Sequence, residues 1–439
     1  MPLSRRLLQP LFTRALTSHT TRRLWRSGHE WLRRAGGRPY RLTLWLQLDD
    51  AYSCLLVQML PRLLHHFPVQ AEFRFLPPGR CVSAYGPLDA CFLAQQFQLN
   101  FKEILPPPPA DARLATRILL AAQSLPVEDF LPLARQVFAC VWEHQPGKLA
   151  TLALRFPPLD ERKTAKRLRA PEDAEAGRLV FLGERYHGLD DLIALAHRLE
   201  ELGLNSQPSS LEQEFAPAAT WLVNDPEQLA AIRSRRYGLD VFFSFQDPRC
   251  WLDFDRILDL ADHYSLQLRL KPVAQPAPET DTFQQQLFDA AREAERLDIP
   301  FGKTCLPDEA GARHCLALMR HAEAEGQARA MARALLEGIW SLGLDTGYMP
   351  HLHRLLERAG LALPNLKEVL QRSATDPDAG REWELLDLPA LPALRLNTRI
   401  PLTVCGPGRA WAIDMALADS LKQHATGQAH WARLWPGLA

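Results

Sequence analysis

The chain of 439 residues is longer than one ordinary domain and suits two or three. Apolar residues make up 47% of it, enough for sizeable cores, but no run approaches the roughly 18 uncharged apolar residues that a membrane helix needs. Basic and acidic residues balance at 51 each, yet residues 1–39 hold nine Arg and one acid, Glu30. The remaining chain has 42 basic and 50 acidic residues, a net charge of −8, which argues against a nucleic-acid groove on the main body.

Residues 1–39 form a basic N-terminal arm. Arg and Pro interrupt its apolar residues, so it lacks the continuous apolar stretch of a secretory signal. Three interpretations stay open: an Arg-rich transit peptide, a basic tether for lipid or RNA, and an amphipathic helix that lies on the body or makes peripheral contact with a membrane. The helical interpretation rests on the apolar residues Leu7, Leu8, Leu11 and Phe12, followed by Leu24 and Trp25.

After the arm, residues 41–48 alternate well enough to predict a strand. Asp50 then caps a helix that we expect over 51–65, where Pro61 should kink the helix or end it early. A second strand is predicted at 69–75, which completes a β-α-β unit.

The rest of the first half reads as helices followed by a short β-β-α ending. Residues 86–148 are predicted to be helical, with a break at the four prolines 106–109. A strand is expected at 178–182, then a turn, a short strand and a closing helix over 190–202.

The second half repeats this order. We predict a strand at 239–245, a helix over 248–263, a strand at 266–270, a long helical block over 281–373, a strand at 402–405 and a helix from about Asp414. Residues 177–190 align without a gap with 401–414, which indicates an internal duplication. The predicted divisions are an arm (1–39), a first domain (40–205), a linker with a helix (206–235), a second domain (236–425) and a tail (426–439).

The order β-α-β, helical insertion, β-β-α is that of a thioredoxin fold with an inserted helical domain. Three stretches of the second half, at 242–252, 338–345 and 400–404, carry a closer similarity. With them the chain resembles the DsbA-like family that includes kappa-class glutathione transferases and 2-hydroxychromene-2-carboxylate isomerases, over 38–205 and more clearly over 236–425. The resemblance implies an α/β fold of two tandem thioredoxin-like domains, each with an inserted helical subdomain.

The resemblance also implies where a site lies. In this family a reactive Cys, or a Ser in the kappa-like members, stands at the start of the helix that follows the first strand. Asp50 and Asp247 occupy that place here, and the fourth position holds Ser53 and Cys250. Neither Asp can supply the thiolate that disulfide exchange needs, and both fit helix N-caps, where the helix N-terminus should lower the pKa of a carboxylate.

Two further places come from the resemblance. The strand edge with a cis proline, which pairs with the backbone of the thiol ligand, falls on Gly177 and Pro401. The Asp that holds the amine of the ligand falls on Asp190 and Asp414, and both of these also fit helix N-caps.

The eight cysteines include no Cys-x-x-Cys and no zinc spacing. Without a secretory signal they are most simply reduced thiols of a cytoplasmic protein, and no metal site is predicted. Cys305 either packs as a free thiol or reaches the cleft.

Three functions stay open. The first is an isomerase- or transferase-type enzyme of the oxidoreductase superfamily that binds glutathione or a related thiol, and a small thiol or aromatic substrate. Its catalytic residues would be Asp247 and Cys250, with Pro401 and Asp414 holding the thiol and Asp50 and Asp190 as their counterparts in a degenerate first domain. The second is a non-catalytic binding or scaffold protein. The third, dithiol oxidation through Cys250 and Cys305, is disfavoured because Cys-x-x-Cys is missing.

Overall fold

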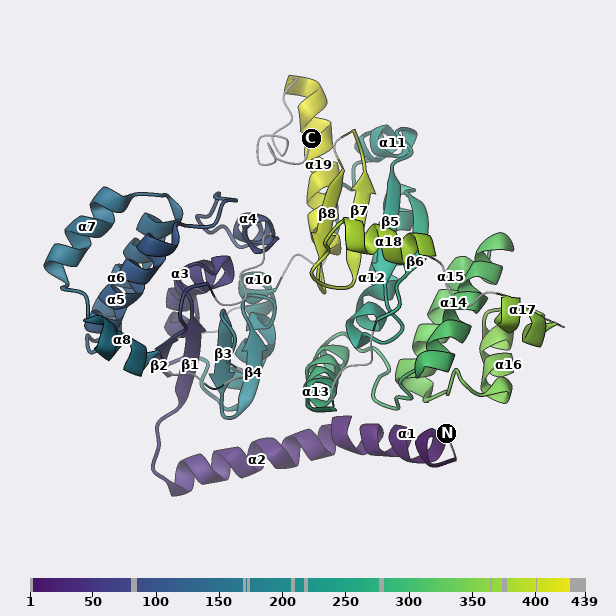
Figure 1. Ribbon diagram of the computed structural model, residues 1–439, viewed down its shortest axis with the longest axis horizontal. Helices are drawn as coiled ribbons and strands as arrows, with labels where there is room; N and C mark the ends of the chain where they lie inside the picture. The colour runs from purple at the N-terminus through teal and green to yellow at the C-terminus, as the bar shows by residue number, and fades with distance from the viewer. Residues whose placement is uncertain are drawn as a thin grey trace. The chain divides into compact units, whose positions relative to one another are not determined.

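The computed structural model (Figure 1) describes residues 3–79, 85–168, 171, 174–206, 210–216, 220–275, 280–363, 365–372, 377–399 and 401–426. The chain divides into two compact units. The first unit comprises Arg26–Thr220, and the second unit joins Met1–Trp25 to Trp221–Ala439. Each unit is built around one four-stranded sheet.

The sheet of the first unit has the strand order β2-β1-β3-β4. The central strand β1 (Arg41–Leu46) pairs in parallel with β2 (Gln70–Phe75) and antiparallel with β3 (Arg178–Phe181). Strand β4 (Glu184–His187) pairs antiparallel with β3 at the edge.

Helix α3 (Ala51–His66) connects β1 with β2 and continues through Pro61, so the expectation that this proline ends the helix early is wrong. The helices between β2 and β3 are α4 (Gly86–Gln96), α5 (Pro109–Ala122), α6 (Val127–Trp142), α7 (Pro146–Arg155) and α8 (Glu161–Arg167). After β4 come α9 (Leu192–Glu201) and the short α10 (Leu211–Phe215), which buries Phe215 completely.

The core of the first unit follows from two periodicities. Strand β1 alternates, so Leu42, Leu44 and Leu46 are fully buried while the residues between them are not. Helix α3 is apolar on most sides and is buried along almost its whole length, as expected of a helix between a sheet and other helices.

The sheet of the second unit has the equivalent order β6-β5-β7-β8. The central strand β5 (Gly238–Phe243) pairs in parallel with β6 (Gln267–Pro272) and antiparallel with β7 (Ala393–Asn397). Strand β8 (Leu402–Cys405) pairs antiparallel with β7. The predicted α/β fold, two thioredoxin-like domains that each carry inserted helices, is confirmed.

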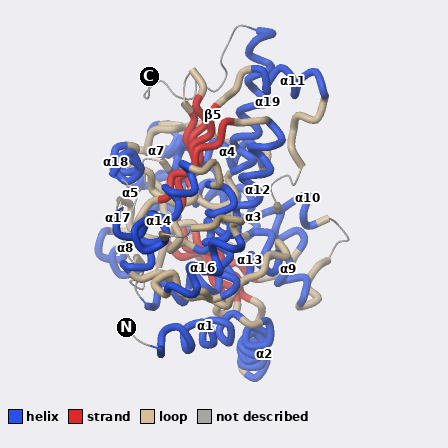
Figure 2. The backbone as a smooth tube through the Cα atoms, turned by 90° about the vertical axis from the view of Figure 1, so that its right-hand side faces the viewer, coloured by secondary structure: helices blue, strands red, loops and turns tan. Residues whose placement is uncertain are grey.

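Helices surround this sheet as they do in the first unit. Short α11 (Pro226–Ser234) precedes β5, and α12 (Pro248–Tyr264) connects β5 with β6. The helices between β6 and β7 are α13 (Thr280–Arg296), α14 (Glu309–Ala324), α15 (Ala328–Glu337), the π-helix η1 (Gly338–Leu342), α16 (Met349–Arg358), α17 (Leu366–Arg372) and α18 (Pro377–Leu385). The last helix, α19 (Ala410–Thr426), packs against α12, β7 and β8, and Figure 2 shows it beside α12.

The ending of the second unit departs from the prediction in two ways. Strand β7 was not predicted, and the strand predicted at 402–405 is β8, which pairs with β7 and not with the central strand. The last helix begins at Ala410, so the predicted start near Asp414 is wrong. Leu394 and Leu396 of β7 alternate with Arg395, but this pattern covers only five residues.

Part of the N-terminal arm belongs to the second unit as helix α1 (Leu3–Thr17). The Thr13 hydroxyl accepts from the Thr304 amide (3.0 Å) and donates to the Thr304 carbonyl (3.3 Å). Gly343 leaves room for Pro10, because a Cβ at Gly343 would lie 2.8 Å from Pro10 Cβ. Helix α1 is therefore a packed element of this unit.

Arg6 adds an ion pair to this contact. Its Nε lies 2.9 Å from Asp345 Oδ2, and its guanidinium lies 3.8 Å from the centre of the Tyr348 ring. A second helix of the arm, α2 (His19–Ala35), follows after Ser18.

A buried carboxylate joins α12 to the start of α19. Asp253 Oδ2 accepts from the Gly408 amide at 2.6 Å. Burial raises the pKa of Asp253 to about 7, and the hydrogen bond from Gly408 opposes this effect only in part.

Replacing Gly343 by Ala should release α1, and Gly360→Ala provides a matched control. Both glycines have φ near +70°, so alanine costs similar backbone strain at the two positions, but no atom lies within 4 Å of the added Cβ at 360. We expect Gly343→Ala to lower the free energy of unfolding by about 1–3 kcal/mol more than Gly360→Ala. Urea denaturation measures this difference, and trypsin should cut residues 1–25 faster. Equal losses and equal cleavage in the two variants would show that α1 is not packed here.

The Asp253→Asn substitution should stabilise the protein progressively as pH rises. Because the folded-state pKa is raised, unfolding releases a proton between pH 4 and pH 7, so wild-type stability falls across that range, by on the order of 1 kcal/mol per pH unit. Asn still accepts from Gly408 and does not titrate. Denaturation curves should therefore show an advantage for the variant that grows from pH 4 to about 7 and then stays constant. An advantage independent of pH would contradict the burial of this charge.

Candidate functional site

Both central strands lead into a helix whose N-cap is an aspartate. Asp50 Oδ2 accepts from the Ser53 amide at 2.7 Å at the start of α3, and Asp247 Oδ1 accepts from the Arg249 amide at 2.9 Å at the start of α12. The prediction that these two residues are helix N-caps is confirmed.

The residue three positions after each capping aspartate makes an equivalent hydrogen bond in the two units. Ser53 Oγ accepts from the Gln47 amide at 3.1 Å, and Cys250 Sγ accepts from the Ser244 amide at 3.4 Å. In each unit the donor lies three residues before the aspartate, and the fourth residue is buried. Ser53 and Cys250 therefore tie the strand end to the first turn of the helix.

The residue two positions after the aspartate distinguishes the units. In the second unit Arg249 closes a two-pronged ion pair on Asp247, with Nε to Oδ1 at 2.9 Å and Nη2 to Oδ2 at 2.6 Å. Asp247 is only 5% exposed. Both of its oxygens are thus engaged within the protein.

In the first unit the same position holds Tyr52, which turns away from the cap. Its hydroxyl donates to Asp89 Oδ2 at 3.0 Å. Asp50 remains partly exposed and holds no cation comparable with Arg249 among the interactions described for it.

The charge state of Asp50 differs from the expectation. Loss of hydration raises the pKa of Asp50 to about 6, although hydrogen bonds from Ser53 favour the carboxylate. The expectation that the helix N-terminus would lower this pKa is therefore wrong. A carboxyl group with this pKa exchanges protons close to neutral pH.

The strand edge next to Asp50 is formed by Gly177. It directly precedes β3 and has φ +69°, and a Cβ added there would lie 3.3 Å from Asp50 Oδ2. The Gly177 carbonyl accepts from the Gly188 amide at 2.8 Å. Gly177 and Asp50 thus lie together, as the resemblance implied.

The counterpart of Gly177 in the second unit is Pro392. Trp45 pairs with Arg178, and the equivalent Phe242 pairs with Ala393, the residue after Pro392. The Pro392 carbonyl accepts from Gly406 at 2.9 Å, as Gly177 does from Gly188, and the Leu391–Pro392 bond is cis.

Pro401 was therefore assigned to the wrong strand. It precedes β8, which lies at the edge of the sheet, and not β7, which pairs with the central strand. The Ile400–Pro401 bond itself lies outside the described residues, because Ile400 is among those left out.

Asp414 is also misplaced by the ungapped alignment. It lies inside α19 and is 2% exposed. Its oxygens accept from the Leu222 amide (3.0 and 3.2 Å) and from the Tyr264 hydroxyl. This carboxylate joins elements of the second unit and does not stand before the last helix.

Asp190 lies in the exposed turn before α9, as predicted. The N-cap of that helix is the next residue, Asp191, whose Oδ2 accepts from the His187 amide at 2.8 Å. Asp190 is thus not the cap.

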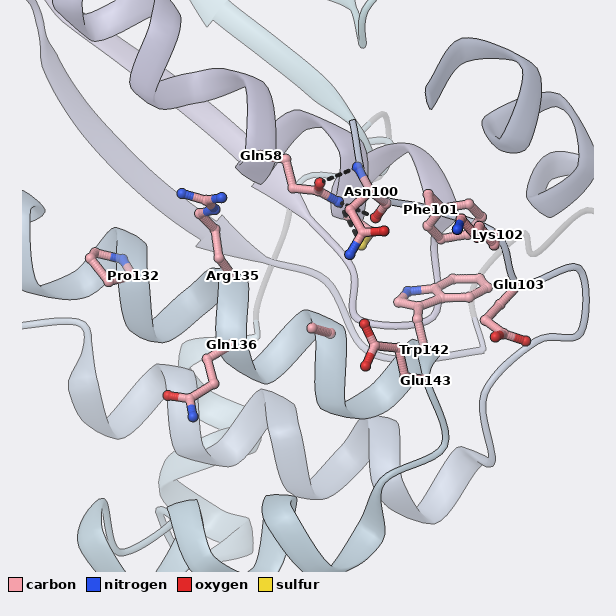
Figure 3. A pocket seen from close by; sticks show the side chains of 12 residues that line it. Gln58, Asn100, Phe101, Lys102, Glu103, Pro132, Arg135, Gln136, Trp142 and Glu143 are labelled. Atoms are coloured by element: carbon pink, nitrogen blue, oxygen red, sulfur yellow. Dashed lines mark hydrogen bonds between the residues drawn. The ribbon is translucent and has the colours of Figure 1, made fainter. Parts of the chain in front are cut away.

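The first unit also contains a cavity that the sequence did not suggest (Figure 3). Its volume is about 650 Å³. It lies between α3, the loop after α4 and helix α6, and its lining residues are Cys54, Gln58, Asn100, Phe101, Lys102, Glu103, Pro132, Arg135, Gln136, Ala139, Trp142 and Glu143. Cys54 lies one helical turn beyond Asp50, so the cavity adjoins the start of α3.

The floor of this cavity is apolar and aromatic. Phe101 and Trp142 pack edge to face with ring centres 5.0 Å apart, and Trp142 Nε1 is buried without a hydrogen-bond partner in the described part of the chain. Gln58 holds the loop by donating to the Asn100 carbonyl (3.0 Å) and accepting from its amide (2.9 Å). Lys102 and Arg135 lie exposed at the rim.

The thiols are not poised for exchange. The seven cysteines in the described residues are all buried. Burial raises the pKa of Cys54 to about 12 and that of Cys250 well above its usual range. Cys305, the proposed distant partner of Cys250, is 1% exposed.

Metal-binding clusters and membrane-spanning helices are both absent from the described residues. They contain no group of three His, Cys, Asp or Glu side chains arranged to hold a metal ion. None of the helices within the described ranges is both long and apolar enough to cross a membrane.

Comparison with known proteins gives one match to a family model. Residues 238–379 match the model of the DSBA-like thioredoxin domain. None of the curated proteins matches the chain.

Two solved structures illustrate the similarity. A 2-hydroxychromene-2-carboxylate isomerase is 18% identical with a TM-score of 0.36, and the match covers 44% of this chain and 99% of that one. The cytosolic disulfide reductase DsbM from Pseudomonas aeruginosa is 16% identical with a TM-score of 0.34, covering 44% of this chain and 100% of that one. The match to the DSBA-like thioredoxin domain therefore falls within the second unit, over residues 238–379, which include strands β5 and β6 of its sheet.

Proposed function

We propose that the protein binds glutathione or a related small thiol and acts as an isomerase- or transferase-type enzyme, with its working site in the first unit. The observation that carries this proposal is the state of Asp50. It is partly exposed, its pKa is about 6, and it lies against the strand edge at Gly177. A general acid or base works best when its pKa is near the working pH.

The neighbouring cavity supports a ligand with both aromatic and anionic parts. Phe101 and Trp142 offer an apolar floor, and Lys102 and Arg135 at the rim can pair with carboxylates such as the two of glutathione. A small aromatic substrate fits the floor, while a thiol ligand extends toward Asp50. Asp50 would then move a proton to or from the bound substrate.

This assignment moves the expected catalytic centre from the second unit to the first. Asp247 is held by Arg249 and is almost fully buried, and the Cys250 thiol supports the backbone of the junction. Neither group is accessible to a substrate. In this proposal the second unit has no catalytic role.

A non-catalytic binding or scaffold protein is the second candidate. The closed junction of the second unit favours it, because that unit keeps the fold without an open reactive group. The equal strand orders of the two sheets are what a tandem duplication would leave. The buried cysteines of the described residues suit a reducing, cytoplasmic location.

Ligand binding separates the two candidates. Millimolar glutathione should raise the melting temperature of the wild type and of Asp247→Asn equally, but that of Asp50→Asn much less. Asn caps helices as well as Asp, so both variants should fold. Asp50→Asn and Asp247→Asn make the same substitution at equivalent positions of the two units, so each variant is a control for the other.

The outcomes of this experiment are distinct. No shift in the wild type would favour the scaffold protein. An undiminished shift in Asp50→Asn together with a lost shift in Asp247→Asn would return the site to the second unit.

Thiol reactivity tests the exclusion of disulfide exchange. In a Cys81→Ser variant, which removes the one cysteine outside the described residues, Ellman's reagent should label the native protein only as fast as it unfolds. The protein should also fail to reduce insulin above the uncatalysed rate. Rapid labelling of Cys250, or catalysed reduction of insulin, would restore the dithiol hypothesis.

A further inference from the structure

Exposed apolar side chains are concentrated in the N-terminal arm. Twelve large apolar side chains of the described residues are exposed, and seven of them lie between residues 8 and 32: Leu8, Leu11, Phe12, Leu24, Trp25, Trp31 and Leu32. A concentration of this kind marks a surface that contacts another apolar phase.

Helix α1 has two different faces. The face toward the second unit carries Pro10, Thr13 and Thr17, which are buried. The opposite face carries Leu8, Leu11 and Phe12, which are 62%, 60% and 56% exposed. The more apolar face is therefore the one that points to solvent.

The contacts of α1 keep it in this orientation. Turning the apolar face inward would break the paired hydrogen bonds of Thr13 with Thr304 and the ion pair of Arg6 with Asp345. The contacts that hold α1 against the second unit therefore keep Leu8 and Leu11 exposed to solvent.

Helix α2 also has exposed apolar side chains on one side. Leu24 and Trp25 are 70% and 41% exposed, and Trp31 and Leu32, seven residues further on, are 67% and 61% exposed. This spacing places the four side chains on one side of the helix. Other positions of α2 form ion pairs, as Arg22 does with Glu295 at 2.5 Å.

Charge decides which partner fits this apolar surface. Arg6 and Arg22 of the arm form ion pairs with the second unit, but Arg14 and Arg23 are exposed, so a second copy of the arm would bring Arg against Arg. Anionic lipid headgroups complement the same charges, and basic helices with Leu, Phe and Trp on one side lie in the plane of such membranes. We propose that the exposed apolar face of α1, with Leu24 and Trp25 of α2, forms a docking surface for an anionic membrane, independently of the function proposed above.

Sedimentation with vesicles tests this proposal on the full-length protein. The protein should sediment with vesicles of phosphatidylcholine and phosphatidylglycerol, and much less with phosphatidylcholine alone. Raising the salt to 0.5 M should weaken the binding, because it screens the arginines.

The test needs a variant on the outer face of α1. Leu11→Ser/Phe12→Ser should lower the bound-to-free ratio at least tenfold, since both side chains are exposed and the fold does not depend on them. Leu154→Ser/Leu385→Ser is the matched control, because these leucines are each 85% exposed but lie outside the arm. It should bind like the wild type.

Three results would overturn the proposal. They are the absence of sedimentation with anionic vesicles, equal binding of the two double variants, and a wild-type dimer in light scattering that Leu11→Ser/Phe12→Ser dissociates. The last result would assign the surface to a second copy of the chain.

Discussion

The architecture of both units depends on the aspartate that caps the helix after the central strand. The first amides of that helix have no partner within it, and the carboxylate of Asp50 or Asp247 satisfies one of them. The fourth residue then accepts an amide from the end of the strand. Two side chains thus fix the angle at which strand and helix meet, and a thiol at the first position would lose this cap.

The capping aspartate has a different electrostatic environment in the two units because the residue two positions after it differs. Arg249 neutralises Asp247 and closes the second unit, whereas Tyr52 at the equivalent place bonds to Asp89 and leaves Asp50 without such a cation. The carboxyl group of Asp50 loses hydration without gaining a cation, and its pKa is raised as a result. The residue two positions after the aspartate therefore decides whether the carboxylate is held in an ion pair, as in Asp247, or can exchange protons, as in Asp50.

The sequence predicted the features that depend on local patterns. Asp50 and Asp247 were recognisable as caps, and β1 as a strand, because capping and alternation act over a few residues. Strand β7 was missed because five residues carry too short a pattern, and without it Pro401 and Asp414 took the places of other residues. The pKa of Asp50 and the cavity beside Trp142 depend on segments distant in the chain, which no local spacing encodes.

The central claim is that Asp50, while it caps α3, has a pKa raised to about 6. A carbon-13 NMR titration of aspartate carboxyl groups, with the Asp50 signal identified by its loss in Asp50→Asn, measures this directly. The account predicts a midpoint near pH 6. A midpoint at or below the value of about 3.9 for an unperturbed aspartate would contradict it.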